Sequence, residues 1–247
     1  MKTIELSARM QALADMVSKG RRVCDIGCDH GWVSIYLVQQ GIATKVYAMD
    51  VRTGPLERAR EHIRDYHLET YIETRLSDGL AQLQVGEADC MVCAGMGGPL
   101  MRKILTEGHT KARSMKELIL QPQSEVAEFR KFLRLEGYKV IEENMIYEDG
   151  KYYPMMKVVP IRNAERINEG DLADRDVVEE QALWDAFGEV LLKKKHPVLQ
   201  QYLEFSVNQV ENLLLHLKEQ GTVRAQGRIQ ELEKELCLLQ KAQNYKE

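Results

Sequence analysis

Segments typical of β-strands and helices alternate along the first part of this 247-residue chain. Residues 23–26 form a largely apolar run that ends in a glycine, and a helical pattern begins at Trp32. The same succession continues with strands expected at 45–50, 70–78, 89–95 and 117–122, and helices at 55–66, 99–105 and 124–136. Such alternation favours a mostly parallel sheet covered by helices on both faces, so we expect a doubly wound, Rossmann-like α/β domain.

Two further segments belong to this domain. Residues 1–18 repeat apolar side chains about one helical turn apart, which predicts a short amphipathic helix: Leu6, Met10, Leu13 and Val17. Residues 138–160 have the pattern of two strands joined by a tight turn at Asp149-Gly150. We expect this antiparallel hairpin to close the sheet, so the first domain spans residues 1–160.

The composition changes after residue 160. A polar stretch at 162–176 is typical of a linker, and no strand pattern follows it. Two apolar series then follow the alternating spacing of four and three residues that coiled coils use: Leu199, Leu203, Ser206, Val210, Leu213 and Leu217, and then Ile229, Leu232, Leu236 and Leu239. Gly221 lies between the series, so we expect a helical coiled-coil domain over 161–247 that pairs within one chain; pairing in a homodimer is the alternative.

Charge and hydropathy limit the partners of the chain. With 34 basic and 38 acidic residues the formal net charge is −4, which argues against a uniformly basic, nucleic-acid-binding coat. No stretch reaches the roughly 20 apolar residues of a membrane-spanning helix, and the first residues lack a hydrophobic signal segment. We therefore expect a cytoplasmic protein without a membrane partner, in which any nucleic-acid site is a local patch.

The cysteines, at positions 24, 28, 90, 93 and 237, suit reduced thiols better than a disulfide framework. A zinc site formed by the first four thiolates is the alternative. Residues three apart in a strand point to opposite faces of the sheet, so Cys90 and Cys93 cannot easily share a metal ion. We predict buried core cysteines and no metal site.

The glycine turn after the first expected strand is the most informative segment. Gly27 and Gly31 are four residues apart, Asp29 takes the place of the middle glycine of a dinucleotide-binding motif, and Asp25 precedes the turn. Acidic side chains here would repel a pyrophosphate but suit a ligand that carries a sulfonium and an ammonium group. S-adenosylmethionine (SAM) has both groups, so we predict it as the cofactor.

Two later strand ends carry acidic residues that fit the nucleoside part of SAM. Asp50 lies 25 residues after Asp25, where a carboxylate accepts hydrogen bonds from ribose hydroxyls, and Asp78 is placed to accept from the adenine amino group. Each alone also suits an ordinary turn. The predicted cofactor-binding residues are Asp25, Gly27, Asp29, His30, Gly31, Asp50, Val51, Ser77, Asp78, Gly79, Ala94 and Gly95.

The end of the fourth expected strand carries a glycine-rich sequence, Ala94-Gly95-Met96-Gly97-Gly98-Pro99. It lacks the Asn or Asp, two prolines and aromatic residue with which many methyltransferases grip an exocyclic amine. Its exposed backbone can instead lie against a flat ring, although an ordinary glycine-rich turn is the alternative. We predict that Gly95, Met96 and Gly97 belong to the catalytic site together with Asp29.

These motifs together carry a resemblance to a known family. They are LSARM at 6–10, DIGCDHGW at 25–32, AGMGG at 94–98 and LQPQ at 120–123. The chain resembles the bacterial tRNA (adenine-22-N1)-methyltransferases, whose motifs read roughly LSxRL, DIGSDHAYLP, AGMGG and LQPN. It departs from them at Gly31-Trp32, where the family has Ala-Tyr, and at Gln123, where it has Asn. The resemblance implies methylation of N1 of adenine 22 in tRNA and a coiled-coil domain after the catalytic core.

Methylation of adenine N1 makes modest chemical demands. The nitrogen has an in-plane lone pair and needs no deprotonation, so the main requirement is in-line placement. Asp29 is our candidate to stabilise the positive charge that develops on the base, with binding of the methionine amine as the alternative. Because the base must be turned out of the RNA, Trp32 is a candidate stacking platform, and a packed core position is its alternative.

Other residues are candidates for contact with the RNA. His30 suits a hydrogen bond to cofactor or phosphate, or simply a helix cap, and the run of lysines in the tail suits either the RNA backbone or a solvated surface. The predicted RNA-binding residues are Arg9, His30, Trp32, Gly98, Gln121, Pro122, Lys193, Lys194 and Lys195.

Two other functions remain open at this point. One is a SAM-dependent methyltransferase for another RNA base or a small molecule. The other is a non-catalytic SAM-binding protein whose coiled coil recruits RNA or a partner.

Overall fold

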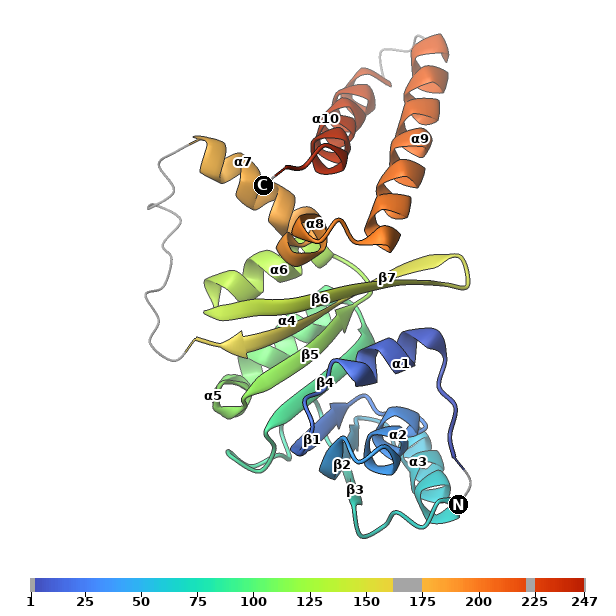
Figure 1. Cartoon of the computed structure of the whole chain (residues 1–247), viewed down its shortest axis with the longest axis vertical. Coiled ribbons are helices and arrows are strands. Elements are labelled where there is room, and N and C mark those ends of the chain that lie inside the picture. The colour runs from blue at the N-terminus through green and yellow to red at the C-terminus, as the bar shows by residue number, and fades with distance from the viewer. Residues whose placement is uncertain (1–2, 162–174, 221–224, 247) are drawn as a thin grey trace. The chain divides into compact units, whose positions relative to one another are not determined.

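The computed structural model describes residues 3–161, 175–220 and 225–246. The chain divides into two compact units, Met1–Asn168 and Glu169–Glu247. Figure 1 shows a twisted sheet with helices on both faces in the first unit and a group of helices in the second. Among the described residues no helix is both long and apolar enough to cross a membrane.

The first unit is built on a seven-stranded sheet with the order β3-β2-β1-β4-β5-β7-β6. Its strands are β1 (Arg21–Ile26), β2 (Ala43–Asp50), β3 (Ile72–Leu76), β4 (Cys90–Met96), β5 (Glu117–Pro122), β6 (Tyr138–Glu148) and β7 (Lys151–Pro160). The first five pair in parallel, and β7 pairs antiparallel with both β5 and β6. The predicted α/β fold, including its closing hairpin, is therefore confirmed.

Helices cover the two faces of this sheet. They are α1 (Ala8–Asp15), α2 (Trp32–Gln39), α3 (Thr53–Asp65), α4 (Gly98–Glu107), α5 (His109–Ser114) and α6 (Val126–Leu135). One apolar cluster lies under α1, α2 and α3, and a second lies under α4, α5 and α6. The helix that follows β1 covers one face of the sheet, and the helix that follows β4 covers the other. Because these neighbouring strands continue to opposite faces, a crevice opens between their carboxyl ends.

The hairpin of β6 and β7 extends beyond the parallel strands. Leu120 of β5 is paired with Met156, so the first residues of β7 continue past the carboxyl end of β5. Tyr147 pairs with Tyr152 near the tip, where their rings are 4.6 Å apart. The tip of the hairpin is thus brought to the same edge of the sheet as the crevice.

The second unit consists of α7 (Arg175–Phe187), α8 (Glu189–Lys193), α9 (Pro197–Gln220) and α10 (Ala225–Gln243). The long helices α9 and α10 pack against each other and run antiparallel (Figure 1). Within this unit Trp184 Nε1 donates to Tyr245 Oη at 3.1 Å, which ties α7 to the end of the chain.

Three details of the sequence-based prediction were wrong. The first helix covers only Ala8–Asp15, because Ser7 caps it and the preceding residues are not helical. The buried residues of α9 include Val207 and Leu214 rather than Ser206 and Leu213. From Leu199 the buried positions are spaced by four residues twice before the first spacing of three, whereas the prediction placed the spacing of three after the first spacing of four. The short helix α5 was missed because six residues give no clear periodicity.

The predicted linker and the glycine between the coiled-coil series fall largely outside the described residues. Residues 162–174 and Gly221 are not described, whereas 175 and 176 already belong to α7.

Candidate functional site

A cavity of about 570 Å³ opens at the carboxyl ends of the parallel strands. Its wall includes the end of β1, the end of β2, the turn after β3, the end of β4 and residues of α1 and β5. The structure brings these predicted residues to it: Arg9, Asp25, Gly27, Asp29, His30, Trp32, Asp50, Val51, Ser77, Asp78, Gly79, Ala94, Gly95, Met96 and Gln121. The volume is in the range of clefts that hold small molecules.

Asp25 and Asp50 are the two buried carboxylates of the cavity wall. The Asp25 side chain accepts a hydrogen bond from Ser34 Oγ of α2 at 2.6 Å, and the residue is 5% exposed. Burial raises the pKa of Asp25 to about 6, the Ser34 hydrogen bond opposes that rise, and the negative charge of Asp50 adds to it. Among the described residues no cationic side chain pairs with Asp25, so a cationic ligand in the cavity would supply the missing countercharge.

Asp50 connects the ends of β1 and β2. Its Oδ1 accepts from the Arg52 backbone N–H at 2.9 Å and its Oδ2 from the Asp29 N–H at 3.4 Å. Each oxygen keeps a second lone pair, so the carboxylate remains able to accept from two hydroxyl groups. Asp29 itself adopts a left-handed conformation (φ 49°), and its side chain is 61% exposed with Oδ2 3.6 Å from His30 Nε2.

The turn that carries Asp78 is held in place by buried polar contacts. Ser77 Oγ donates to the Gly79 carbonyl at 2.9 Å and accepts from the Gln82 N–H at 3.1 Å. The Asp78 side chain is 60% exposed, 3.9 Å from Lys103 Nζ. The Ser77 hydroxyl is thus used to shape the turn, and the Asp78 carboxylate remains accessible at the cavity wall.

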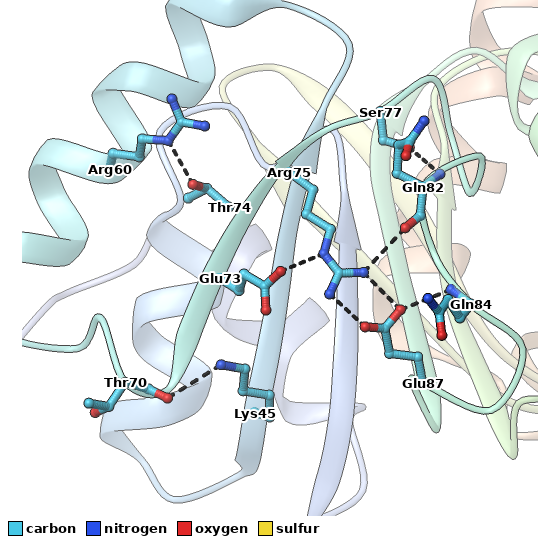
Figure 2. Close-up of polar contacts among 10 residues, drawn as sticks. All are labelled: Lys45, Arg60, Thr70, Glu73, Thr74, Arg75, Ser77, Gln82, Gln84 and Glu87. Atoms are coloured by element: carbon cyan, nitrogen blue, oxygen red, sulfur yellow. Dashed lines mark hydrogen bonds and ion pairs between the residues drawn. The ribbon is translucent and has the colours of Figure 1, made fainter.

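Arg75 of β3 anchors the far side of the same loop, as Figure 2 shows. Its guanidinium donates to Glu87 at 2.5 and 2.7 Å, to Glu73 at 2.7 Å and to the Gln82 carbonyl at 3.2 Å. Hydrogen bonds to Glu87 and Glu73 raise the pKa of Arg75, and the Arg75 hydrogen bond lowers the pKa of Glu87. Sequence analysis missed this network because its members carry no motif.

Glycines and apolar side chains shape the rest of the cavity. Gly27 has φ +71°, and a Cβ at this position would lie 2.2 Å from Met96 Cε, so a larger residue would displace that side chain. Val51 is 61% and Leu100 is 44% exposed although both line the cavity, which leaves apolar surface for a flat ring. Leu100 was not predicted.

An aromatic stack lies beside the cavity. The Trp32 ring is stacked on His62 of α3 with centroids 3.8 Å apart, and His30 lies 6.3 Å from Trp32. Nδ1 of His62 is 2.9 Å from the His30 carbonyl, which must accept, so Nδ1 carries the proton. Trp32 is partly buried and lines the cavity, and His62, which sequence analysis missed, covers part of its ring.

Arg9 and Gln121 join the start of the chain to the cavity wall. Arg9 Nη1 donates to Gln121 Oε1 at 3.2 Å, and its backbone N–H donates to Glu148 Oε1 at 3.1 Å. The Arg9 guanidinium also lies over the ring of Tyr153, 4.8 Å from its centroid. Glu148 and Tyr153 are about 140 residues away in sequence, so no local pattern predicts them.

The structure does not bring every predicted residue to the cavity wall. Gly31, Gly97, Gly98 and Pro122 are next to lining residues but are not part of it. A Cβ on Gly98 would lie 2.6 Å from the Ser124 carbonyl oxygen, so this glycine permits close packing of α4 on the loop after β5.

Lys193, Lys194 and Lys195 belong to the second unit. Lys193 Nζ is 2.9 Å from Glu189 Oε1 and 5.3 Å from the centroid of the Trp184 ring, so it is engaged within that unit. All three lysines are exposed.

The cysteines of the first unit are buried free thiols. Cys90 belongs to the apolar cluster on one face of the sheet, and Cys93 to the cluster on the other face. Burial raises the pKa of Cys93 to about 12, which keeps it a thiol. Within the described residues no three His, Cys, Asp or Glu side chains are grouped so that they would hold a metal ion.

Comparison with known proteins decides the family. A family model described as a methyltransferase domain matches residues 6–156. The chain belongs to this methyltransferase family. Its resemblance to tRNA (adenine-22-N1)-methyltransferases, predicted from the motifs, is also confirmed: residues of this chain are 35% identical, over 156 positions, to the tRNA (adenine(22)-N(1))-methyltransferase of Bacillus subtilis. That match covers 63% of this methyltransferase and 66% of the B. subtilis protein, just under two thirds.

Solved structures of relatives match over nearly the whole length of this methyltransferase. The B. subtilis m1A22 tRNA methyltransferase TrmK is 27% identical, with a TM-score of 0.79 and coverage of 97% of this chain and 99% of that one. A Streptococcus pneumoniae protein described as a candidate tRNA (m1A22) methyltransferase, solved with S-adenosyl-L-methionine, is 26% identical with a TM-score of 0.79. The match covers 97% of this chain and 100% of that one.

Proposed function

We propose that this methyltransferase uses S-adenosylmethionine to methylate N1 of an adenine in tRNA, at position 22. The observation that carries the proposal is the set of carboxylates around the strand-end cavity in a chain of this family. Asp25 is buried there without a cationic partner among the described residues, and Asp50 keeps free acceptor capacity. The similarity to relatives named for this activity, one of them solved with SAM, supports the same function.

The residues of the cavity fit this cofactor. Asp25 would balance the positive charges of its methionine end, Asp50 would accept from the ribose hydroxyls, and Asp78 would accept from the adenine amino group. Val51 and Leu100 offer apolar surface to a flat ring. When bound, the cofactor supplies an electrophilic methyl group on a sulfonium.

The residues of this chain then have to place the acceptor base and stabilise its charge. N1 of adenine has its lone pair available, so placement contributes more than proton transfer and no general base is needed. Asp29, at the cavity wall with an exposed carboxylate, would stabilise positive charge on the methylated base. Trp32 would stack on a base turned out of the RNA.

We also propose that residues 161–247 form a coiled-coil domain that holds the tRNA, with α9 and α10 pairing within one chain. The exposed Lys194 and Lys195 would contact phosphates there. A tRNA substrate supports a cytoplasmic location.

The test is methyl transfer from labelled SAM to two transcripts of one tRNA, with adenine or guanine at position 22. We expect transfer only to the first, and 1-methyladenosine as the product on digestion. Equal transfer to both would reject the position, and transfer to free nucleosides would reject tRNA as the specific substrate. SAM binding without any transfer would reject catalysis.

A further inference from the structure

Gly95 lies near the end of β4, at an irregular backbone position that we call the Gly95 turn. The pairing of β4 with β5 shifts register between Ala94 and Met96, and Gly95 has φ +75°. Its backbone N–H donates to the side chain of Gln121, at 3.3 Å from Oε1. A side chain of β5 therefore holds the backbone of the glycine-rich turn at the point where regular pairing is interrupted.

The Gln121 side chain is fixed by three contacts. Its Oε1 accepts from both the Gly95 N–H and Arg9 Nη1, and its Nε2 donates to the Pro122 carbonyl at 3.3 Å. Rotating the amide by half a turn would place its NH₂ group against two donors, so only one orientation is favourable. The residue is 1% exposed, and its polar atoms are used inside the protein, so we assign it no direct contact with RNA.

Arg9 is in turn held by the hairpin. Glu148 accepts from the Arg9 N–H through Oε1 and from Ser7 Oγ through Oε2, each at 3.1 Å, and its Oε2 is 3.8 Å from Arg9 Nε. The ring of Tyr153 supports the flat side of the guanidinium. Contacts therefore run from Glu148 through Arg9 and Gln121 to Gly95.

We propose that Arg9, Gln121 and Glu148 form a positioning unit that sets the backbone of the Gly95 turn, and thereby the place where the acceptor adenine meets the methyl donor. This role rests on the proposed function. Gly95 lines the cavity together with Ala94 and Met96. Because the C=O and N–H of a trans peptide point in opposite directions, holding the Gly95 N–H towards β5 also directs the Ala94 carbonyl away from β5.

The contacts explain two sequence features that a cofactor site alone leaves unexplained. The LSARM segment supplies Ser7 and Arg9, and the LQPQ segment supplies Gln121. The two segments are far apart in the sequence. In the structure Ser7 and Arg9 both donate to the Glu148 carboxylate, and Arg9 also donates to the amide oxygen of Gln121.

Two substitutions of Gln121 test the proposal. Gln121→Met keeps the length of the side chain but removes the acceptor oxygen, whereas Gln121→Glu retains an acceptor for both Gly95 and Arg9. We expect Gln121→Met to lower kcat about tenfold or more, because small displacements of reacting groups are costly, with the Kd for SAM and the KM for tRNA within about threefold. Gln121→Glu should restore most of kcat.

A second readout does not depend on activity. The Gly95 amide is held by a side chain in an exposed turn, so its hydrogen exchange, measured by NMR, should become about tenfold faster in Gln121→Met, in line with the loss of one hydrogen bond, and remain slow in Gln121→Glu. Unchanged exchange in Gln121→Met would overturn the positioning unit. A rise in KM for tRNA at constant kcat would also overturn it, because that result indicates a direct RNA contact.

Glu148 provides a remote variant in the partly exposed hairpin. Glu148→Ala should accelerate Gly95 exchange and lower kcat about threefold to tenfold, whereas the matched Glu142→Ala, on the same strand, should change neither by more than about twofold. Equal effects of the two variants would contradict the inference. If the wild-type protein methylates no adenine, the proposed function fails, while the exchange of Gly95 still decides whether the unit exists.

Discussion

Two buried carboxylates at opposite ends of the sheet have opposite electrostatic surroundings. Glu117, at the start of β5, is 3% exposed and accepts from Ser18 N at 2.8 Å and Ser18 Oγ at 2.7 Å, with Lys157 Nζ and Arg21 Nη2 each 3.5 Å away. Asp25, near the end of β1, is 5% exposed and has the Ser34 hydroxyl as its close partner. Similar burial therefore leaves one charge balanced and the other unbalanced.

The pKa values follow this difference. Burial alone would raise the pKa of Glu117, but the Ser18 hydrogen bonds and the charges of Lys157 and Arg21 outweigh it, so that pKa is lowered. Burial raises the pKa of Asp25 to about 6. Glu117 therefore stabilises the folded state itself, whereas Asp25 is retained at a cost to stability, as expected of a group that binds a cationic ligand.

Replacing Asp25 should have the largest effect on the cofactor. Asp25→Asn removes the negative charge but keeps the size of the side chain, so we expect the Kd for SAM to rise about 100-fold, as for loss of a buried countercharge. Calorimetric titration measures it. Asp89→Asn, which removes a carboxylate paired with Arg22 at the other end of β1, should change that Kd less than about twofold. Equal Kd values for Asp25→Asn and wild type would show that Asp25 does not bind the cofactor.

Stability should change in opposite directions at the two ends. Glu117→Gln leaves Lys157 and Arg21 without their carboxylate and should lower the free energy of unfolding by about 3 kcal/mol, measured by urea denaturation at pH 7.5. Asp25→Asn should raise it by about 1–3 kcal/mol without SAM, because ionising an aspartate of folded pKa about 6 is unfavourable relative to an unfolded pKa of about 3.9. Destabilisation by both variants would refute the contrast.

The pH dependence of cofactor binding should follow the raised pKa of Asp25. Because the folded pKa lies above the unfolded one, this group reduces the free energy of unfolding as pH rises from about 4 to about 6. The same ionisation favours a cationic ligand, so the affinity for SAM should fall about tenfold per pH unit below about pH 6. A flat profile in wild type, equal to that of Asp25→Asn, would contradict the assignment.

Trp32 tests the substrate side of the cavity. Trp32→Ala should raise the KM for tRNA about tenfold through loss of base stacking, and Trp32→Tyr should retain most of the affinity. The Kd for SAM, measured on the same samples, should stay within about threefold. A change confined to SAM binding would assign Trp32 to the cofactor instead.

The lysines of the second unit should have the smallest effect. We expect Lys194→Gln combined with Lys195→Asn to weaken tRNA binding about threefold and to reduce its dependence on salt, because phosphate contacts release counterions. Asn suits position 195, where φ is 47°. Filter binding at two salt concentrations measures the effect, and an unchanged salt dependence would exclude these lysines from the interface.

The sequence predicts features that depend on neighbouring residues or on topology. Alternating strands and helices define the sheet, and since parallel strands end at one edge, Asp25, Asp50 and Asp78 were expected to converge, as they do around the cavity. Their roles toward the cofactor remain predictions.

Contacts between distant segments were not predictable. Glu148 meets Arg9 across 139 positions, and the direction of the Gln121 amide depends on a register shift that no residue pattern encodes. His62 is one of several polar residues on α3, and its ring meets Trp32 only because the start of α2 approaches α3 in the folded chain. The buried stripe of α9 was displaced by one residue at Val207 for a similar reason, because its partner helix decides which side is covered.

The most direct test of the contrast between the two carboxylates is the proton balance of SAM binding at pH 6, measured by titration calorimetry in two buffers of different ionisation enthalpy. Binding should lower the pKa of Asp25 and release about half a proton per SAM in wild type, and close to none in Asp25→Asn. Glu117→Gln should release as much as wild type. Binding without proton release in wild type would show that Asp25 is not the countercharge of the cofactor.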